Sequence, residues 1–574
     1  MTEQQTYDVA IVGSGVSGAY TAYRLMRNWQ DSPKLRALVE GRGGDSLRVG
    51  VFDTLDRVGG RLWSYSFPEA PDLIAELGGQ GFTALMRNVH GLATKELDLD
   101  VVPSPSFNHG LFMYLRGSRF WPDAYRDTSN FPSSASTHLN FPIRYFVDED
   151  EKKNPGELVL ERMFDAIPEM AEPVQELMTL LKGRSEDRIQ KALPLMARLW
   201  TVLRTAKVKS NVRATPPETW EIGFWNWMLE TVSNEAYLLN LGSAFTISFD
   251  RNYNLYDTIL GYLAVMLAYF DDVPFWTIAN GYDQIPQQMM HRVQSMGGDL
   301  TQNTQLTAVH QAADGFRLEF TSLDGGAPYQ IDAAITVLAL PKGALARLDR
   351  ESVMYQNPEF PDLLNAVNAT PATKFFTLYN DAWWKQTFPQ GQPAFGYSTT
   401  DMPMKACYYI GESDENGRAL MLASLTDSAN AQFWNRFGFA QDLDQYTSAF
   451  VAGKAGRLSA PADMEAEVTA QLQVMHFDPG TGTVPTPIAS CFQNWANFPY
   501  EGGWHLWHPH LQSWEIMPRI RQPVEGMDLY ICGEAYSALQ GWVEGGINTA
   551  EKMLQDHFGL NRAAWIDADY DIGP

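Results

Sequence analysis

A glycine-rich turn near the N-terminus constrains the fold of this chain more than any other feature. The apolar segment Tyr7–Val12 predicts a buried strand, and Ser17–Asn28 predicts a helix that follows it directly. Between them, the turn Gly13–Gly18 has the pattern GxGxxG. Its first glycine permits the tight bend, its second lets a pyrophosphate approach the backbone, and its third lets the helix pack on the strand. The N-terminus of the helix offers free N–H groups to the phosphate. The turn therefore predicts a dinucleotide site formed by Gly13, Gly15, Val16, Ser17 and Gly18.

A second predicted strand, Arg48–Phe52, supports this interpretation. It ends at Asp53, a carboxylate suited to the ribose hydroxyls of a dinucleotide. Asp53 follows Gly18 at a longer interval than the usual ~20 residues. An insertion at Asp31–Ser46 accounts for the excess.

Length and charge narrow the classes of protein and partner. A chain of 574 residues exceeds the ~250–300 at which one core stops growing, so several domains are expected. Its net charge of −25 repels nucleic acid and anionic membranes, so neither is an expected partner. The charge serves either to keep the protein soluble or to steer a cationic substrate. The three cysteines form no CxxC pair, so we expect no disulfide framework and no metal site. With no basic leader and no apolar run of ~18 residues, the expected location is cytoplasmic.

The remaining patterns predict an α/β fold with three parts. Amphipathic periodicity indicates helices at Leu158–Leu181 and Asp187–Val208, and a closing helix at Ile547–His557. Further strands are predicted at Asp299–Val309, Phe316–Phe320, Ala333–Leu340 and Met527–Cys532. We expect a discontinuous Rossmann-like domain (residues 1–68, 276–345 and 508–574) and an α+β substrate-binding domain with a mixed sheet (69–145 and 346–507). The third part is a helical insert (146–275).

Four other segments point to the kind of dinucleotide. Asp53–Arg61 and Glu76–Phe82 follow the second strand, whereas Gly533–Ala535 and Gly541–Gly546 lie near the other end of the chain. Together they resemble the nucleotide-binding segments of the flavin-dependent amine oxidases, which include monoamine, polyamine and L-amino acid oxidases. The resemblance spans essentially the whole chain, with the helical insert matching least. It implies that FAD is held by Asp53, Thr54, Arg61, Gly78, Gly79, Gln80, Gly81, Leu306, Glu534, Gly541, Trp542 and Val543. Leu306 is included because Asn303–Leu306 resembles the strand whose backbone meets adenine in that family.

The same resemblance assigns three residues to the reacting end of FAD. Lys374 corresponds to a lysine that holds a water at flavin N5, with a surface lysine as the alternative. Trp504 and Trp542 correspond to the two walls of an aromatic cage that guides the amine and excludes water. The pair Trp383-Trp384 also fits the family pattern. Non-covalent FAD is expected, because Gly503 occupies the position of the cysteine that links flavin in monoamine oxidases.

The sequence gives conflicting indications about the substrate. Ser398–Tyr409 resembles a stretch of L-amino acid oxidases, and Gly541-Trp542 also follows their pattern. However, the arginine and tyrosine that bind the substrate carboxylate in those enzymes fall at Gly81 and Ser424. A buried carboxylate without a partner costs several kcal/mol, so an amino acid substrate requires a replacement. Arg87 and Arg251 are the candidates.

We therefore expect an FAD-dependent oxidase that converts an L-amino acid, molecular oxygen and water into a keto acid, ammonia and hydrogen peroxide, through an imine that hydrolyses. An oxidase of amines without a carboxylate, a flavin dehydrogenase or desaturase that does not use oxygen, and a flavin-bearing binding subunit remain as alternatives. The preferred side chain and the oligomeric state, a homodimer included, stay open.

Overall fold

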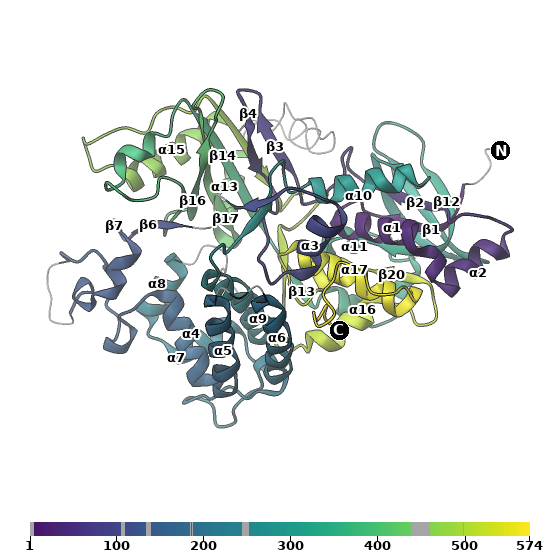
Figure 1. Ribbon diagram of the computed structural model, residues 1–574, viewed down its shortest axis with the longest axis horizontal. Coiled ribbons are helices and arrows are strands. Elements are labelled where there is room, and N and C mark those ends of the chain that lie inside the picture. The colour runs from purple at the N-terminus through teal and green to yellow at the C-terminus, as the bar shows by residue number, and fades with distance from the viewer. Residues whose placement is uncertain are drawn as a thin grey trace.

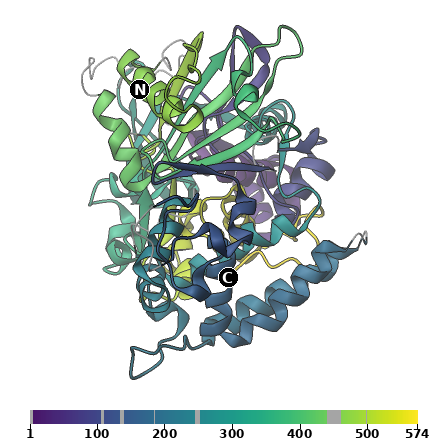
Figure 2. The same cartoon turned by 90° about the vertical axis from the view of Figure 1, so that its left-hand side faces the viewer.

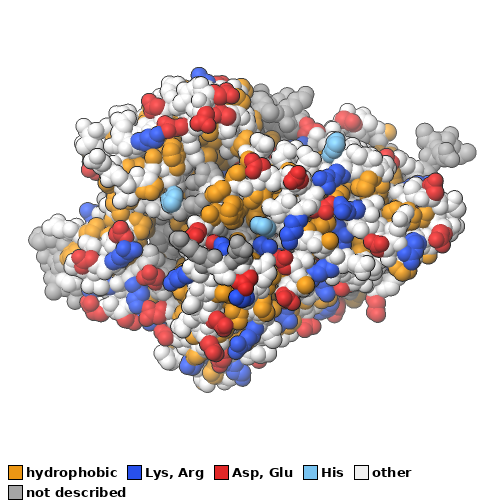
Figure 3. Space-filling model, in the orientation of Figure 1, with side chains coloured by type: hydrophobic (Ala, Val, Ile, Leu, Met, Phe, Trp, Pro, Cys, Tyr) orange, Lys and Arg blue, Asp and Glu red, His pale blue; other side chains and the backbone are white. Residues whose placement is uncertain are grey.

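The computed structural model describes residues 5–104, 109–133, 139–183, 185, 187–243, 252–438, 460–497 and 499–574. Figure 1 shows three lobes, with one sheet on the right, a second sheet at the upper left and a group of helices at the bottom. The first described strand, β1 (Thr6–Val12), lies in the right-hand lobe, and the C-terminus lies beside it. On the face shown in Figure 3, acidic and basic side chains are interspersed. Within the described residues, no helix combines the length and apolar character needed to cross a membrane.

The first sheet has the mixed order β10-β11-β12-β1-β2-β9, and β20 also pairs with β12. The strands around β1 are parallel, whereas β10, β11 and β12 are antiparallel to one another. The strands are β1 (Thr6–Val12), β2 (Val49–Phe52), β9 (Asp299–Thr301), β10 (Thr304–Ala312), β11 (Gly315–Ser322), β12 (Tyr329–Leu338) and β20 (Leu529–Ile531). All seven fall within the three segments predicted for the nucleotide-binding domain. The domain boundaries themselves stay a prediction.

Helices cover both faces of this sheet, which explains why β1 reads as a continuous apolar run. Val9 and Ile11 point to one core cluster, whereas Ala10 and Val12 point to another. One face is covered by α1 (Val16–Asn28), α10 (Gln284–Ser295) and α17 (Val543–Phe558). The other is covered by α11 (Lys342–Ala346), α12 (Phe360–Leu364) and α16 (Ser513–Arg521). Helices α1 and α17, from opposite ends of the chain, pack side by side (Figure 1).

The insertion at Asp31–Ser46 contains a helix that was not predicted, α2 (Pro33–Gly41), which begins at Pro33 with the Ser32 side chain as its N-cap. One prediction in this lobe needs correction. The strand predicted at Asp299–Val309 is two strands, because Asn303 adopts a left-handed conformation with φ of 53°. After this turn, which hydrogen-bonds to the backbone of Asp53 and Leu55, the chain leaves its pairing with β2 and pairs with β11.

The second sheet has the order β18-β14-β17-β16-β15-β6-β7 and is antiparallel except between β15 and β6. Its strands are β6 (Gly110–Leu115), β7 (Ser118–Phe120), β14 (Ala372–Tyr379), β15 (Gly396–Thr400), β16 (Ala406–Glu412), β17 (Ala419–Asp427) and β18 (Ala489–Asn494). Helices α13 (Ser428–Gly438) and α15 (Ala462–His476) pack on it. Every residue of β14, which pairs with β18 on one side and β17 on the other, is buried, so Lys374 is enclosed by the protein.

Smaller elements join the lobes. Paired strands are β3 (Ser64–Phe67) with β4 (Ala70–Glu76), β5 (Val101–Pro103) with β8 (Trp276–Ile278), and β13 (Val367–Thr370) with β19 (Trp504–Trp507). Helix α3 is Arg87–Gly91. Single helical turns lie at Trp29–Asp31, Leu92–Glu96, Pro122–Arg126, Thr128–Asn130, Glu149–Glu151, Pro168–Met170, Thr219–Glu221, Leu267–Phe270, Val353–Gln356, Trp383–Thr387 and Glu534–Tyr536.

The third lobe contains α4 (Pro155–Ala166), α5 (Ala171–Lys182), α6 (Arg188–Thr205), α7 (Phe224–Thr231), α8 (Asn234–Ser243) and α9 (Leu255–Met266). Figure 2 shows these helices in blue, below the green second sheet. The single helix predicted at Leu158–Leu181 is divided into α4 and α5, because Pro168 has no N–H to continue the ladder. The apolar faces of these helices share one core cluster with β6, β7 and Leu539.

Candidate active site

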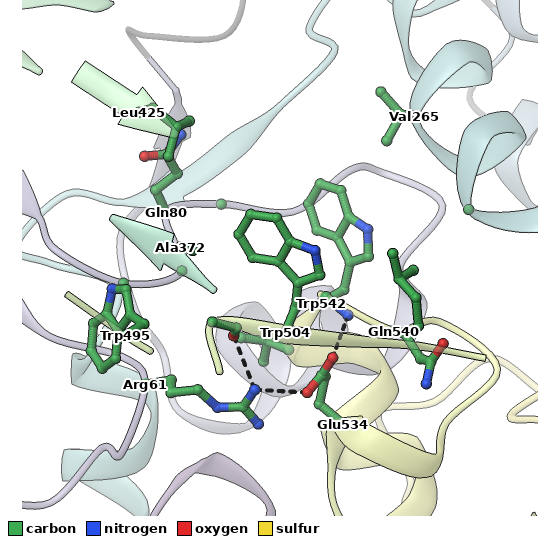
Figure 4. Close-up of a pocket in the computed structure, with 18 of the residues that line it drawn as sticks. Arg61, Gln80, Val265, Ala372, Leu425, Trp495, Trp504, Glu534, Gln540 and Trp542 are labelled. Carbon is green, nitrogen blue, oxygen red and sulfur yellow. Dashed lines mark hydrogen bonds and ion pairs between the residues drawn. The ribbon is translucent and has the colours of Figure 1, made fainter. Parts of the chain in front are cut away.

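A cavity of about 800 Å³ extends from the first sheet to the helical lobe. Its volume lies in the range of ~300–1,000 Å³ typical of ligand sites. One end is lined by the glycine turn, Asp53, Thr54 and the Gly59–Arg61 backbone. The other end is lined by residues of β6, β15, α4, α8 and α9. Figure 4 shows the region between the two ends, where Trp504 and Trp542 lie.

The geometry of the glycine turn agrees with the predicted roles of its glycines. Gly13 has a φ of +103°, and a side chain there would begin 2.5 Å from the Ala339 carbonyl oxygen. A side chain at Gly18 would overlap the Gly13 carbonyl oxygen, so this glycine allows α1 to pack on β1. Gly15, Val16 and Ser17 line the cavity, and the N-terminus of α1 has no side-chain cap. The first N–H groups of α1 are therefore available to a phosphate.

Asp53 lines the cavity, but its carboxylate already binds the chain. Oδ2 accepts hydrogen bonds from Ser14 N at 2.5 Å and Ser14 Oγ at 2.7 Å, and Oδ1 accepts one from Leu55 N at 2.8 Å. Burial raises the pKa of Asp53, and these hydrogen bonds oppose the rise. Asp53 thus holds the glycine turn in place, and the ribose contact stays a prediction. The Leu306 side chain packs in the core with Phe52 and does not line the cavity. The predicted contact with adenine concerns the backbone of this strand and stays a prediction.

Glu534 is the most highly connected charged group of the site. It accepts hydrogen bonds from the Arg61 guanidinium at 2.8 Å, from His505 N at 2.9 Å and from Gly541 N at 2.7 Å. The His505 ring contacts it through Nδ1 at 2.8 Å. Burial alone would raise the pKa of Glu534, but the Arg61 and His505 interactions hold it well below its ordinary value. Glu534 is therefore a permanent anion that joins Arg61 to both tryptophan-bearing segments (Figure 4).

Lys374 lies in the cavity wall and is buried, which rules out the alternative of a surface lysine. Its Nζ donates to Glu76 O at 2.8 Å, to Gly78 O at 2.6 Å and to Gln80 Oε1 at 2.6 Å. Burial lowers the pKa of Lys374 to about 7. Because an ammonium group has three protons, a water at Nζ requires one of these bonds to open. The water-holding role stays a prediction.

The two tryptophans lie where the halves of the cavity meet. Trp504 begins β19, and Trp542 is the N-cap of α17. Gly541, with a φ of +83°, brings the Trp542 segment against Trp504, since a side chain at Gly541 would begin 3.7 Å from the Trp504 Cβ. Phe275 stacks on Trp542 at 6.3 Å between ring centroids. Figure 4 shows the two indoles rising next to each other from neighbouring segments. The arrangement fits the predicted cage.

The glycine segment Gly78–Gly81 forms the adjoining wall, as predicted. A side chain at Gly78 would overlap the Arg61 carbonyl oxygen, and one at Gly81 would begin 2.6 Å from the Trp276 carbonyl oxygen. The arginine of L-amino acid oxidases therefore has no room at position 81 in this backbone. Ser424 occupies the position of the carboxylate-binding tyrosine of L-amino acid oxidases. It is buried, donates to Met404 O at 3.1 Å and does not line the cavity.

Neither candidate carboxylate ligand receives support from the structure. Arg87 pairs with Asp567 at 2.5 Å and does not line the cavity. Arg251 lies outside the described residues.

Trp383 and Trp384 pack in the core of the second sheet, away from the cavity wall.

The structure adds residues that the sequence analysis did not single out. His505 holds Glu534, and Gln540 lines the cavity beside the Trp542 segment. Tyr125, Tyr253, Tyr262, Tyr269 and Tyr397 surround the end of the cavity in the helical lobe. Gln540 and His505 adjoin recognised motifs, which is the one signal that could have identified them. The tyrosines come from separate elements, and no motif connects them.

The fold and the site define a dinucleotide-binding protein whose cavity continues from the nucleotide end into the helical lobe. The sequence profile of the family described as flavin containing amine oxidoreductase matches residues 20–554. The chain belongs to this family. Its cofactor is FAD, bound without a covalent link, and the site fits it. The glycine cradle is open, a cysteine at position 503 would begin 2.5 Å from the Ala372 Cβ, and none of the three cysteines lines the cavity.

The individual relatives have low sequence identity to this chain, but their alignments cover half of it or more. Aplysianin-A from Aplysia kurodai is 24% identical over 96% of this chain and 90% of its own length. Achacin from Lissachatina fulica is 23% identical over 96% of this chain and 93% of its own length. An L-amino-acid oxidase from Pseudechis australis is 23% identical over 56% of this chain and 53% of its own length. A triple mutant of putrescine oxidase superimposes with a TM-score of 0.60 at 16% identity, over 96% of this chain and 99% of that one. The last comparison shows a shared fold.

Within the described residues, no group of three or more His, Cys, Asp and Glu side chains is placed to hold a metal ion.

Proposed function

We propose that this protein oxidatively deaminates L-amino acids with bound FAD. Molecular oxygen takes up the electrons and is reduced to hydrogen peroxide, and water hydrolyses the resulting imino acid to a keto acid and ammonia. Bound FAD supplies the oxidising power by accepting a hydride from the substrate α-carbon and passing the electrons to oxygen. The chain orients the substrate with the tryptophan pair and encloses it beneath the helical lobe. Lys374 and the Gly78–Gly81 backbone form the neighbouring wall.

The observation that carries the proposal is the position of the segment that resembles L-amino acid oxidases. Ser398–Tyr409 includes the end of β15 and the start of β16, and Thr399 lines the cavity together with Tyr397. Ser398, between these two residues, is buried on the opposite face of β15, next to Tyr409. Side chains alternate along a strand, so this segment contributes directly to the substrate chamber. The partial match to a snake L-amino-acid oxidase supports the same class of substrate.

A second candidate is the oxidation of amines that lack a carboxylate. One observation favours it: among the described wall residues, Arg61, Arg347 and Lys374 are the cations, and each already pairs with groups of the chain. The structural likeness to putrescine oxidase is compatible with either substrate class, because it shows only the fold.

A peroxide-coupled screen of the L-amino acids and their decarboxylated amines distinguishes the candidates. We expect the amino acid to exceed its amine by at least roughly tenfold in kcat/KM, which corresponds to ~1.4 kcal/mol of transition-state binding. The D-enantiomer should be inactive, because a fixed carboxylate and side chain turn its α-hydrogen away from the flavin. Equal or faster oxidation of the amine contradicts the proposal. Turnover with a dye but no peroxide would indicate a dehydrogenase.

A further inference from the structure

An L-amino acid substrate needs a hydrogen-bond donor for its carboxylate, and the cations of the described wall are already engaged. Arg61 donates to Glu534 and to Gly503 O, and Arg347 pairs with Glu501. Lys374 donates to three oxygens of the chain. Because a buried carboxylate without partners is costly, a neutral donor in the wall is required.

Gln80 has such a donor, and Lys374 determines its direction. An ammonium group can only donate, so the Gln80 oxygen must face Lys374 Nζ, 2.6 Å away. The amide nitrogen, Nε2, must then face the other way. Among the described residues, no acceptor binds this nitrogen, whereas Gln80 is half-buried and lines the cavity. Gln80 thus presents two unused N–H groups at the wall.

The surroundings of Gln80 suit a carboxylate. Lys374 lies opposite Leu425 in the second sheet, and Leu425 lines the same wall next to Gln80 (Figure 4). The positive charge of Lys374 polarises the amide and strengthens its N–H groups as donors. The next residue, Gly81, has no room for a side chain. Gln80 is therefore the side chain that this segment offers to the substrate.

We propose that Gln80 binds the substrate carboxylate through Nε2, with its orientation set by Lys374. This inference rests on the proposed function, since it concerns how that site recognises an amino acid. It makes Gln80 a specificity-determining residue, replacing the arginine that has no room at position 81.

The test compares Gln80→Glu with the wild type on an L-amino acid and its decarboxylated amine. Glutamate keeps the shape and the acceptor for Lys374, but it removes the donor and repels a carboxylate. We expect kcat/KM for the amino acid to fall at least tenfold and that for the amine to change less than threefold. Gln80→Leu should show the same shift in preference. The FAD content of both variants, from the ratio of flavin to protein absorbance, shows whether the site remains intact.

Gln540→Leu is the matched control for Gln80→Leu. Gln540 also lines the cavity, but its Nε2 donates to Ala535 O at 2.6 Å, so its neutral replacement should affect both substrates alike. Benzoate, which has a carboxylate and no amine, provides a binding measurement through the flavin absorbance. Its dissociation constant should rise at least tenfold in Gln80→Glu and Gln80→Leu, and less than threefold in Gln540→Leu.

The outcomes separate this inference from the proposed function. If the wild type prefers the amino acid and Gln80→Glu leaves that preference and benzoate binding unchanged, only the inference is wrong. Equal losses on both substrates would assign Gln80 to the support of Lys374 and overturn the carboxylate role. A wild type that prefers the plain amine contradicts the proposed function and the inference with it.

Discussion

Glu534 and Arg61 form an ion pair of 2.8 Å that connects the two halves of the site. Arg61 belongs to the nucleotide segment that follows the second strand, and it also donates to Gly503 O, next to Trp504. The other Glu534 oxygen accepts from the backbone N–H groups of His505 and Gly541, which adjoin Trp504 and Trp542. One carboxylate therefore positions both walls of the cage relative to the cofactor site.

Replacing Glu534 with glutamine should destabilise the protein and loosen the cage. The glutamine NH₂ would face N–H groups that need an acceptor, and Arg61 would lose its partner. Breaking a fully buried pair costs about 3–5 kcal/mol, but Arg61 is 23% exposed, so we expect a loss of about 2 kcal/mol at pH 7. Urea unfolding measures the loss. Glu501→Gln, which breaks the more exposed pair with Arg347, serves as the control and should cost less than ~1 kcal/mol.

The effect of Glu534→Gln should depend on pH. The pKa of Glu534 lies well below its ordinary value of 4.5 in the folded protein. A lowered carboxylate pKa stabilises the fold above the unfolded pKa, and the stabilisation is lost as the pH falls toward the folded pKa. The difference in unfolding free energy between wild type and variant should thus be constant above pH ~5 and shrink below pH 4.5. A difference that grows on acidification would contradict the assigned ionisation.

The third glycine of the turn provides a test of the cofactor cradle. In Gly18→Ala the new methyl group would overlap the Gly13 carbonyl oxygen, so α1 must move away from β1. Such overpacking typically costs ~1–3 kcal/mol, and here it also displaces the helix N-terminus that faces the phosphates. We expect a lower FAD content in the purified protein. Gly41→Ala, where nothing lies within 4 Å, is the control and should retain full FAD content.

Lys374→Met should slow the reoxidation of the reduced enzyme by oxygen more than it reduces folding or FAD content. Burial lowers the pKa of Lys374 to about 7, so its positive charge is lost as the pH rises through about 7. The wild-type oxygen rate should therefore fall across that range, and the variant should lack this pH dependence. Stopped-flow traces follow both rates. Unchanged oxygen reactivity in the variant would remove the role assigned to Lys374.

Acid precipitation tests how FAD is attached. The cofactor should appear in the supernatant, because Gly503 has no sulfur to form a link and Cys407, Cys491 and Cys532 are all buried outside the cavity wall. Yellow pellet with a colourless supernatant would indicate a covalent flavin.

The sequence alone was sufficient to recognise the nucleotide-binding parts. The glycine turn, Asp53 and the Gly533–Gly546 region are local signals, since each needs only a few consecutive residues to set a backbone conformation. Local signals failed where distant contacts or a single backbone angle decided the outcome. Pro168 divided a periodic helical run, and Asn303 turned one predicted strand into two. Both residues were visible in the sequence, but apolar periodicity continues across them.

The substrate end was decided by the tertiary structure. Gln80 gains its direction from Lys374, almost three hundred positions later, through a hydrogen bond that no spacing rule anticipates. The Leu306 side chain packs in the core because side chains alternate along β10, and the backbone contact with adenine that the resemblance implies stays a prediction. The tyrosines of the substrate chamber converge from β15, α9 and the loops around them only after the lobes pack. Glycine-rich backbone turns follow from short-range sterics and can be predicted from the sequence. The partners of a buried polar group depend on which elements come together in the folded protein.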